Sequence, residues 1–568
     1  MAPPFSKLEL ANSMHGCCCT YGVRLLVLLI LAFHCGAAIS TTRVDPQSPT
    51  FDIRIVNGQV IDGTGRARFR ADVGIRGDTV AAVGDLSRAT AKITIDARDQ
   101  VVAPGFIDLL GHSESSVLVE PMLEGKVRQG VTTEVTGEGH SPGPLNDAMI
   151  AEANRTRPPG FPEITWHTLA EFMREVEKRG SAINFAFYIG AANPREIVIG
   201  TADRPPTPEE LRRMEQIVDE SMRAGAVGMS TALIYPPGRF ASTDELIALA
   251  RVVSKYGGSY WTHLRNEADN ISAALGEAFR IGREAKVPVN IFHLKTGGKM
   301  RGHMPEVVAK IEAEQKRGLD VASNVYPYTA TSTDLTSIVP AWALEGGYLP
   351  FVARIKDPAT RAKVAAEMRV GDGSTILIRN LPQAPPDMNQ FERRRLSDIA
   401  TALNVAPAEA ALRLFEASNS SPIAIYFGLL EDDLKAALKQ PWVAVGSDSG
   451  AVVGVMREVG AHPRAYGTFP RILGHYVRDE HLFTLEEAVR KMTSLAASRA
   501  KLSDRGILRA GMRADVVVFD PKTIRDVSTY EDPHHYSVGI SNVIVNGTAV
   551  LRDGNVTGAL PGRVLRHH

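Results

Sequence analysis

The chain has 568 residues, of which 44% are hydrophobic and 23% charged, as is usual for a large globular protein. Lysine plus arginine and aspartate plus glutamate number 64 each. Because there is neither a basic excess nor a basic stripe, the sequence lacks the positive surface that drives nucleic-acid binding. We therefore expect no nucleic-acid partner.

The beginning of the chain has the pattern of a secretory signal peptide. Arg24 precedes the apolar run from Leu25 to Phe33, and small residues follow at positions 36–38. The run is too short to span a membrane comfortably. We expect residues 1–38 to be a cleaved signal peptide, the mature protein to be periplasmic or secreted, and no stable membrane insertion to remain. An uncleaved anchor, or a true start at Met14, is the alternative.

Cysteine is confined to this leader. All four cysteines lie at positions 17, 18, 19 and 35, so the mature chain would contain no thiol. Disulfides and thiolate metal ligands are then excluded, and histidine and carboxylate side chains must hold any metal.

Segments near the two ends share a pattern of short strands. Residues 51–97 alternate apolar and polar side chains around tight-turn dipeptides such as Asn57-Gly58, and residues 506–520 and 543–550 repeat this texture. We expect a small β-sandwich domain built from both termini, covering residues 51–100 and 505–555.

Between these segments, apolar strand-like runs alternate with helical periodicity, which indicates βα units and a parallel sheet. The candidate strands begin near Val101, Thr132, Ile183, Val227, Gly258, Val287, Asp320 and Trp442. Eight is the number of strands in a closed barrel. We therefore predict the α/β class, with a (β/α)8 TIM-like barrel over residues 101–504. An open doubly wound sheet is the alternative, but no glycine-rich phosphate loop follows the first strand.

A long segment, residues 334–440, interrupts the alternation before the last strand. Barrel sites open at the carboxyl ends of the strands, so an insertion there is placed to act as a lid. A surface elaboration without a catalytic part is the alternative.

Polar residues that metals prefer follow several of these strands. His112 ends the stretch A-P-G-F-I-D-L-L-G-H. Glu138 lies between two glycines, so its side chain has free space around it and is not needed for packing. His263 and His293 each end an apolar strand, as does Asp448 in V-A-V-G-S-D. Each of these residues could instead have a purely structural role. The histidines could be core residues, the glutamate could be exposed in a turn, and the aspartate could cap a helix.

In combination, these motifs resemble the D-aminoacylase (N-acyl-D-amino-acid deacylase) family of the amidohydrolase superfamily. The segments that carry the resemblance are A-P-G-F-I-D, T-H-L-R, H-L-K, G-S-D and H-P-R-A-Y-G-T-F-P-R. The resemblance implies that Glu138, His263 and His293 bind zinc and leave one coordination position for water. Glu138 stands where that family has a metal-binding cysteine. Asp448 would be the general acid and base.

Two departures from the family pattern affect the expected number of metal ions. Leu110 replaces the first histidine of a His-x-His pair, and residues 190–195 lack the histidine of the third strand. The second, weaker metal position has therefore lost a ligand. We expect one catalytic ion, zinc by preference, with His112 as an auxiliary or occasional ligand.

The resemblance also implies a set of substrate-binding residues. Arginine and lysine can hold a free carboxylate, and arginine alone does so with two parallel bonds. The expected substrate-binding residues are Lys295, Arg464, Tyr235 and Tyr326.

Three functions are compatible with these observations. The first is hydrolysis of N-acyl-D-amino acids, or of L-x-D-x dipeptides, to a carboxylate and a D-amino acid. The second is a cyclic-amide hydrolase of the dihydroorotase or hydantoinase kind, although residues 221–240 contain no lysine for its metal bridge. The third is a secreted binding protein that lost catalysis. The partner in each case is a small molecule, and the oligomeric state cannot be read from the sequence.

Overall fold

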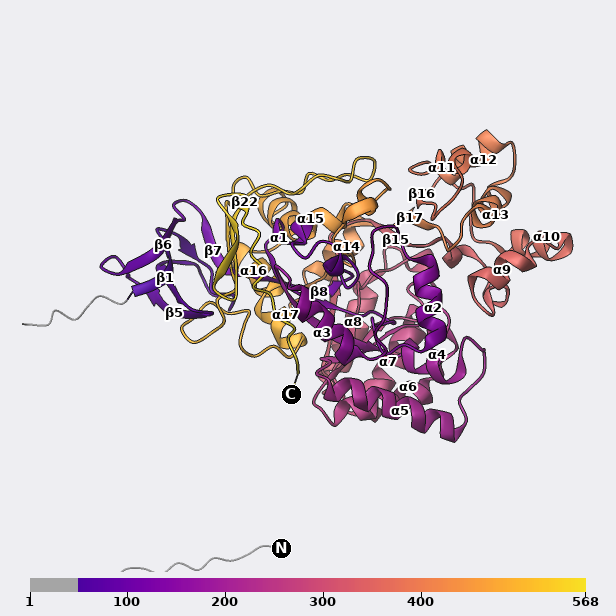
Figure 1. Cartoon of the computed structure of the whole chain (residues 1–568), viewed down its shortest axis with the longest axis horizontal. Coiled ribbons are helices and arrows are strands. Elements are labelled where there is room, and N and C mark those ends of the chain that lie inside the picture. The colour runs from indigo at the N-terminus through magenta and orange to yellow at the C-terminus, as the bar shows by residue number, and fades with distance from the viewer. Residues whose placement is uncertain (1–49, 568) are drawn as a thin grey trace, which may run out of the picture. The chain divides into compact units, whose positions relative to one another are not determined.

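The computed structural model describes residues 50–567 (Figure 1). Eight parallel strands follow one another in a single sheet in the order β18-β14-β13-β12-β11-β10-β9-β8. These strands are β8 (Phe106–Gly111), β9 (Val131–Thr136), β10 (Asn184–Gly190), β11 (Gly228–Ala232), β12 (Ser259–His263), β13 (Val289–Ile291), β14 (Val321–Val325) and β18 (Val443–Val445). A parallel bridge between Gly111 and Ser449 joins the two edge strands. The predicted TIM-like barrel is confirmed.

The first barrel strand does not begin where the sequence pattern placed it. Val101–Pro104 forms a separate strand, β7, which pairs with β19 (Val516–Phe519) and with β2 (Gln59–Val60) outside the barrel. Gly105 breaks the apolar run, and a Cβ atom there would lie only 2.1 Å from the Thr132 side chain. The expectation of a barrel strand from Val101 was therefore wrong, because one apolar run serves two sheets.

Helices follow the barrel strands and cover the outside of the barrel. Thr207 caps α5 with a capping box and Pro208 opens it, as the local sequence indicates. Helices α5, α6 and α7 lie side by side (Figure 1). The helices up to residue 316 are α1 (Glu124–Val127), α2 (Asp147–Thr156), α3 (Leu169–Arg179), α4 (Ala192–Ile199), α5 (Pro208–Arg223), α6 (Thr243–Ser254), α7 (Ile271–Ala285) and α8 (Met304–Lys316).

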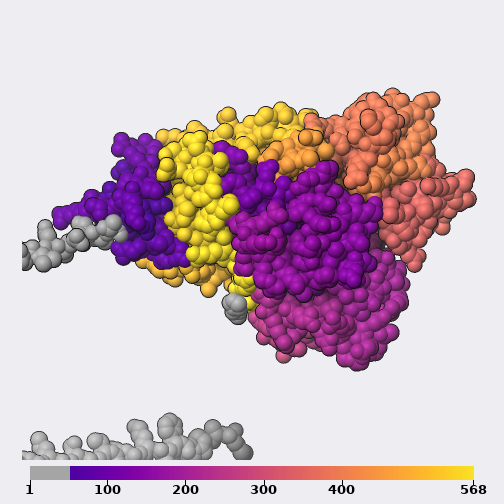
Figure 2. All heavy atoms as spheres, viewed as in Figure 1, coloured from indigo at the N-terminus to yellow at the C-terminus, as the bar shows by residue number. Residues whose placement is uncertain are grey.

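The two ends of the described chain form two further sheets. In Figure 2 the indigo N-terminal and yellow C-terminal residues lie side by side, as the pairing of β7 with β19 requires. Buried aliphatic residues of both sheets share one core. The sheets have the orders β5-β4-β1-β6 and β22-β21-β20-β19-β7-β2-β3. Their remaining strands are β1 (Thr50–Val56), β3 (Phe69–Arg70), β4 (Asp72–Arg76), β5 (Thr79–Gly84), β6 (Thr90–Asp96), β20 (Ile540–Val545), β21 (Thr548–Arg552) and β22 (Asn555–Val556).

The long segment before the last barrel strand has its own antiparallel sheet and its own hydrophobic core. The sheet has the order β15-β17-β16, with β15 (Ala330–Asp334), β16 (Ile376–Asn380) and β17 (Ile423–Phe427). The helices from there on are α9 (Tyr348–Arg354), α10 (Pro358–Glu367), α11 (Pro386–Asn389), α12 (Leu396–Leu403), α13 (Pro407–Ala417), α14 (Glu431–Leu438), α15 (Arg464–Arg471), α16 (Leu485–Met492) and α17 (Ser494–Arg499).

Within residues 50–567, every helix is either too short or too polar to cross a bilayer. The predicted signal peptide, residues 1–38, lies outside the described residues and stays a prediction.

Candidate metal centre

Glu138 follows barrel strand β9 in a turn that only glycine can form at two positions. Gly137 and Gly139 have φ values of +109° and +68°. A Cβ atom on Gly139 would approach the Ala232 Cβ to 2.5 Å, so this turn packs directly against the end of strand β11. The two glycines thereby fix a carboxylate at the carboxyl end of β9.

Two histidines and an aspartate reach the same end of the barrel. His263 is the last residue of β12, His293 lies two residues beyond β13, and Asp448 lies three residues beyond β18. His293 and Asp448 have positive φ values of +34° and +50°. Such conformations are uncommon outside glycine and are concentrated at functional sites. Barrel enzymes place their catalytic groups at this end.

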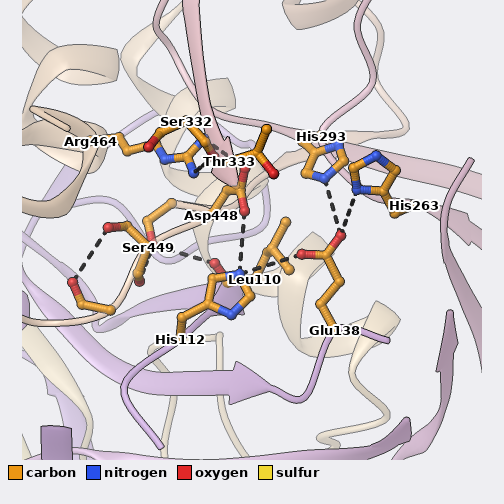
Figure 3. Close-up of polar contacts among 12 residues, drawn as sticks. Leu110, His112, Glu138, His263, His293, Ser332, Thr333, Asp448, Ser449 and Arg464 are labelled. Atoms are coloured by element: carbon orange, nitrogen blue, oxygen red, sulfur yellow. Dashed lines mark hydrogen bonds and ion pairs between the residues drawn. The ribbon is translucent and has the colours of Figure 1, made fainter. Parts of the chain in front are cut away.

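The two histidine rings converge on one oxygen atom of Glu138 (Figure 3). His263 Nδ1 lies 3.0 Å and His293 Nε2 lies 3.2 Å from Glu138 Oε1. These three side chains offer ligand atoms that all lie within 4.8 Å of one another. Both histidines are almost completely buried, with 6% and 3% of the residue surface exposed. The structure thus brings together the three residues that the sequence proposed as ligands.

This arrangement fits a tetrahedral metal ion. Bonds of about 2.0 to 2.1 Å to nitrogen and oxygen place neighbouring ligand atoms of a tetrahedral ion about 3.3 Å apart. The observed Glu138–histidine separations match that value. Burial alone would raise the pKa of Glu138, but the rings of His293 and His112 more than offset this effect and hold that pKa well below its usual range. Glu138 is therefore an ionised ligand candidate.

A second carboxylate, which the sequence reasoning missed, lies behind both histidines. Glu267 Oε1 is 3.1 Å from His293 Nδ1, and Glu267 Oε2 is 3.3 Å from His263 Nε2. The ring nitrogens that face away from Glu138 therefore both meet the same side chain. A carboxylate in this position fixes the ring orientation and increases the basicity of metal-binding histidines. The sequence signal was the spacing of four residues between His263 and Glu267.

Replacing Glu267 with glutamine is expected to weaken metal binding by about 10- to 100-fold. The amide would remove the negative charge that both rings face, so the rings would be less well oriented and less basic. Titration of the metal-free protein with zinc against a competing chelator measures this change. An unchanged affinity would contradict the supporting role of Glu267, and Glu277→Gln, on the nearby helix α7, is the matched control.

His112 and Asp448 form a second constellation beside Glu138. His112 Nε2 lies 3.4 Å from Glu138 Oε2 and 3.3 Å from Asp448 Oδ1 (Figure 3). About a third of the His112 side chain is exposed, unlike the two buried histidines. Leu110, which lies in β8 two residues before His112, has a fully buried aliphatic side chain. A second ion here would have only three protein ligands, one of them shared with the first group.

Asp448 is paired with a buried arginine. Arg464 Nη1 lies 2.7 Å from Asp448 Oδ2. Burial would raise the pKa of Asp448, but the Arg464 guanidinium, with the rings of His293 and His112, lowers it to about 2. Asp448 is therefore a carboxylate at neutral pH and can accept a proton.

A buried ion cluster, again not foreseen from the sequence, holds the backbone on both sides of Asp448. Lys126 Nζ contacts Asp108 Oδ2 at 2.7 Å and the Ser449 carbonyl at 2.7 Å. Asp108 in turn accepts a bond of 2.8 Å from the Ser447 backbone N–H. Neither Lys126 nor Asp108 is exposed to solvent. The cluster fixes the turn in which Asp448 adopts its unusual backbone conformation.

A cavity of about 710 Å³ opens above these groups. Glu138, His263, His293 and Asp448 lie at its wall together with three of the four expected substrate-binding residues, namely Lys295, Tyr235 and Tyr326. Residues of the 334–440 insertion, including Ile338, Arg369 and Tyr426, form another part of the wall.

The expected substrate-binding residues have different surroundings. Lys295 Nζ lies 2.9 Å from Glu267 Oε1, and the Tyr235 hydroxyl is hydrogen-bonded to Thr333 Oγ1. The Tyr326 hydroxyl is buried and has no hydrogen-bond partner among residues 50–567. Arg464 is the exception, because it does not line the cavity and its charge is used by Asp448.

The barrel, the clustered ligands and the neighbouring carboxylate define a metal-dependent hydrolase. The sequence matches the model of the amidohydrolase family over residues 94–551, and the chain belongs to this family. It is therefore a hydrolytic enzyme with a metal centre.

Comparison with individual relatives narrows the class of hydrolase to which the chain is similar. The chain is 38% identical to a D-aminoacylase of Alcaligenes xylosoxydans xylosoxydans over 523 residues, which cover 91% of this chain and 98% of the relative. It is similar, with 33% identity and a TM-score of 0.78, to an N-acyl-D-glutamate deacylase of Bordetella bronchiseptica solved with zinc and a phosphonate mimic of the tetrahedral intermediate. That match covers 91% of this chain and 100% of the other.

Similarity to cyclic-amide hydrolases is weaker: a dihydroorotase of Bacillus subtilis is 28% identical over only 145 residues, which cover 23% of this chain and 34% of the relative. A D-hydantoinase structure matches with a TM-score of 0.52 and only 15% identity, over 91% of this chain and 99% of that one. The predicted membership of the D-aminoacylase group is confirmed, and the cyclic-amide alternative is not favoured.

Proposed function

We propose that this enzyme cleaves the amide bond of N-acyl-D-amino acids with the help of one zinc ion held by Glu138, His263 and His293. The observation that carries the proposal is the convergence of two buried ring nitrogens on one Glu138 oxygen, in the same cavity as Asp448. The proposed substrate class and stereochemistry are supported by the relatives, which are a D-aminoacylase and deacylases of N-acyl-D-glutamate and N-acyl-D-aspartate.

The side chains around the metal position have complementary tasks. A bound zinc ion supplies Lewis-acid polarisation of the scissile carbonyl and a water molecule of lowered pKa. Asp448, ionised and oriented by Arg464, accepts the proton of the attacking water and returns it to the departing nitrogen. The Tyr326 hydroxyl, which has no hydrogen-bond partner in the described part of the chain, can donate a hydrogen bond to the substrate. Lys295 and Tyr235 line the same cavity and would contact the bound substrate.

One panel of substrates tests this function against its alternatives. Racemic N-acetyl amino acids, L-x-D-x dipeptides and hydantoins are incubated with enzyme containing zinc and with chelator-treated enzyme, and the products are separated on a chiral column. We expect D-amino acids from the linear amides, zinc dependence, and no opening of the hydantoins. Release of L-amino acids alone, hydantoin opening, or no hydrolysis at all would contradict the proposal, and the last outcome would favour a binding protein.

The Arg464–Asp448 pair predicts a change in pH dependence. Replacing Arg464 with methionine removes the cation that stabilises the Asp448 carboxylate, so the pKa of Asp448 rises. Because the carboxylate is the active form, the acid limb of the kcat/KM profile should move to higher pH, by about one to three units. A higher KM with an unmoved acid limb would mean that Arg464 serves substrate binding alone.

We further propose that residues 1–38 direct the protein to the periplasm or the exterior. The support is the short apolar run 25–33 after Arg24 and the small residues that follow it. N-terminal sequencing of the exported protein tests this proposal. We expect a first residue shortly after position 38, and a mature product that begins at Met1 or Met14 would contradict cleavage.

A further inference from the structure

The first and last strands of the barrel are joined at few points. Neighbouring strands elsewhere in the barrel pair over at least three residues, whereas within residues 50–567 β8 and β18 share one bridge, between Gly111 and Ser449. His112 follows β8 and Asp448 follows β18, so these two residues, 3.3 Å apart, lie on opposite sides of the seam (Figure 3). Their relative position depends on what joins the two strands.

The side chain of Lys126, in helix α1, lies at this seam. Its Nζ is 2.7 Å from Asp108 Oδ2 of β8 and 2.7 Å from the Ser449 carbonyl beyond β18. It is also 3.1 Å from Glu134 Oε2 of β9, and the lysine side chain has no solvent exposure. Burial alone would lower the pKa of Lys126, but the Asp108 and Glu134 carboxylates more than offset this effect and raise it. A buried cation therefore links three segments of the barrel.

This cation holds the residues on both sides of Asp448. The Ser447 backbone N–H donates a bond of 2.8 Å to Asp108 Oδ1. The Ser447 hydroxyl lies 2.6 Å from Asp108 Oδ2 and accepts a bond of 2.9 Å from Lys126 Nζ. On the other side, the Ser449 carbonyl accepts directly from Lys126. The turn that gives Asp448 its positive φ is thus fixed at both ends by one lysine.

The same network reaches the residues around His112. The His112 backbone N–H donates a bond of 3.2 Å to the Ser449 carbonyl, which also accepts from Lys126. Glu134 Oε1 accepts a bond of 2.7 Å from the Ser113 backbone N–H, and Glu134 Oε2 accepts one of 2.8 Å from the Ser113 hydroxyl. Both loops that meet at the seam are therefore tied to the Lys126 charge.

We propose that Lys126 is a positioning residue for the reaction, because its buried charge closes the barrel seam and thereby sets the place of the Asp448 carboxylate beside the metal centre. The inference rests on the proposed function, in which Asp448 moves the proton. Lys126 is buried and lies outside the cavity wall, so its effect passes through the backbone on either side of Asp448. A misplacement of about 1 Å at a reacting group can cost about 100-fold in rate.

The proposal separates proton transfer from metal binding. The contacts of Lys126 are with Asp108, Glu134 and the turn around Asp448. The three residues proposed to hold the ion are not among these contacts. Loss of the lysine should therefore lower kcat while the bound metal and KM change little.

The test compares Lys126→Met with Lys491→Met in the zinc-loaded enzyme. Lys491 is the matched control, because it is also buried and donates hydrogen bonds to the carbonyls of Gln440 and Val443, at the opposite end of β18. We expect Lys126→Met to lower kcat by about 10- to 100-fold, with about one equivalent of zinc and a KM changed by less than about threefold. Lys491→Met should lower the thermal stability and leave kcat within about twofold of the unmodified enzyme.

A double-mutant cycle distinguishes positioning from a general structural effect. When Lys126→Met is added to Asp448→Asn, it should cost less than about threefold in kcat, because the carboxylate that the lysine positions is already absent. A further loss as large as in the unmodified background would overturn the proposal. Full kcat in Lys126→Met, or a loss confined to KM or to the metal content, would do the same.

A second variant covers the case in which Lys126→Met does not fold. Ser447→Ala removes one hydroxyl contact of the lysine and leaves every charge in place. It should lower kcat by about 3- to 30-fold with unchanged metal content, and an unchanged kcat would contradict the role of Lys126. If the unmodified enzyme hydrolyses no N-acyl-D-amino acid, the proposed function fails. If it does so and neither variant affects kcat, only the positioning role is overturned.

Discussion

Replacing Glu138 with alanine is expected to lower the bound metal from about one equivalent to less than about a tenth and to reduce kcat/KM at least about a thousand-fold. The physical reason is that Glu138 Oε1 is the atom on which both histidine nitrogens converge. Without this anion, two neutral imidazoles remain, and neither charge balance nor three-ligand geometry is kept. Metal analysis after dialysis, together with steady-state kinetics, measures both effects.

A cysteine at position 138 provides a matched comparison. Thiolate is a good zinc ligand with a bond of about 2.3 Å, so Glu138→Cys should retain metal and part of the activity. Glu196→Ala is the control, because the one ion pair of Glu196 within residues 50–567 is with the exposed His140. Full metal content and activity in Glu138→Ala would show that the ion is bound elsewhere.

Replacing Asp448 with asparagine is expected to lower kcat by about 100- to 10,000-fold while the metal stays bound. Asparagine keeps the shape of the side chain beside His112 and Arg464, but it cannot accept the proton. The three residues that hold the ion are unchanged, so metal content should remain near one equivalent. Kinetics and metal analysis on the same preparation separate the two quantities.

Two outcomes would contradict this role of Asp448. Near-normal turnover with metal bound would mean that another group moves the proton. Loss of the metal in the variant would mean that Asp448 is chiefly a ligand, as its place in the His112–Glu138–Asp448 group allows.

Much of the fold could be predicted from the sequence because barrel strands and helices have distinct hydrophobic patterns. Seven of the eight barrel strands begin within two residues of the predicted starts, and the first begins at Phe106, five residues after Val101. The error was at Val101, where Pro104-Gly105 divides one apolar run between β7 and β8. Hydrophobicity shows that a segment is buried, but not which of two sheets it joins.

The site could be predicted only in part, because sequence motifs name single residues and not their partners. Glu138, His263 and His293 were found because each follows a strand whose carboxyl end faces the barrel mouth. Glu267 was missed as a site residue, since its contact with His293 depends on how the segments after two different strands pack together. Arg464 was predicted to bind the substrate, but its charge is paired with Asp448.

The central claim is that one metal ion is bound by a carboxylate and two imidazoles at the mouth of the barrel. A crystal structure of the zinc-loaded protein, with anomalous differences recorded at the zinc absorption edge, tests it most directly. We predict one strong peak about 2.0 to 2.2 Å from Glu138, His263 Nδ1 and His293 Nε2. A peak that lies away from these three atoms, or no peak in catalytically active crystals, would contradict the claim.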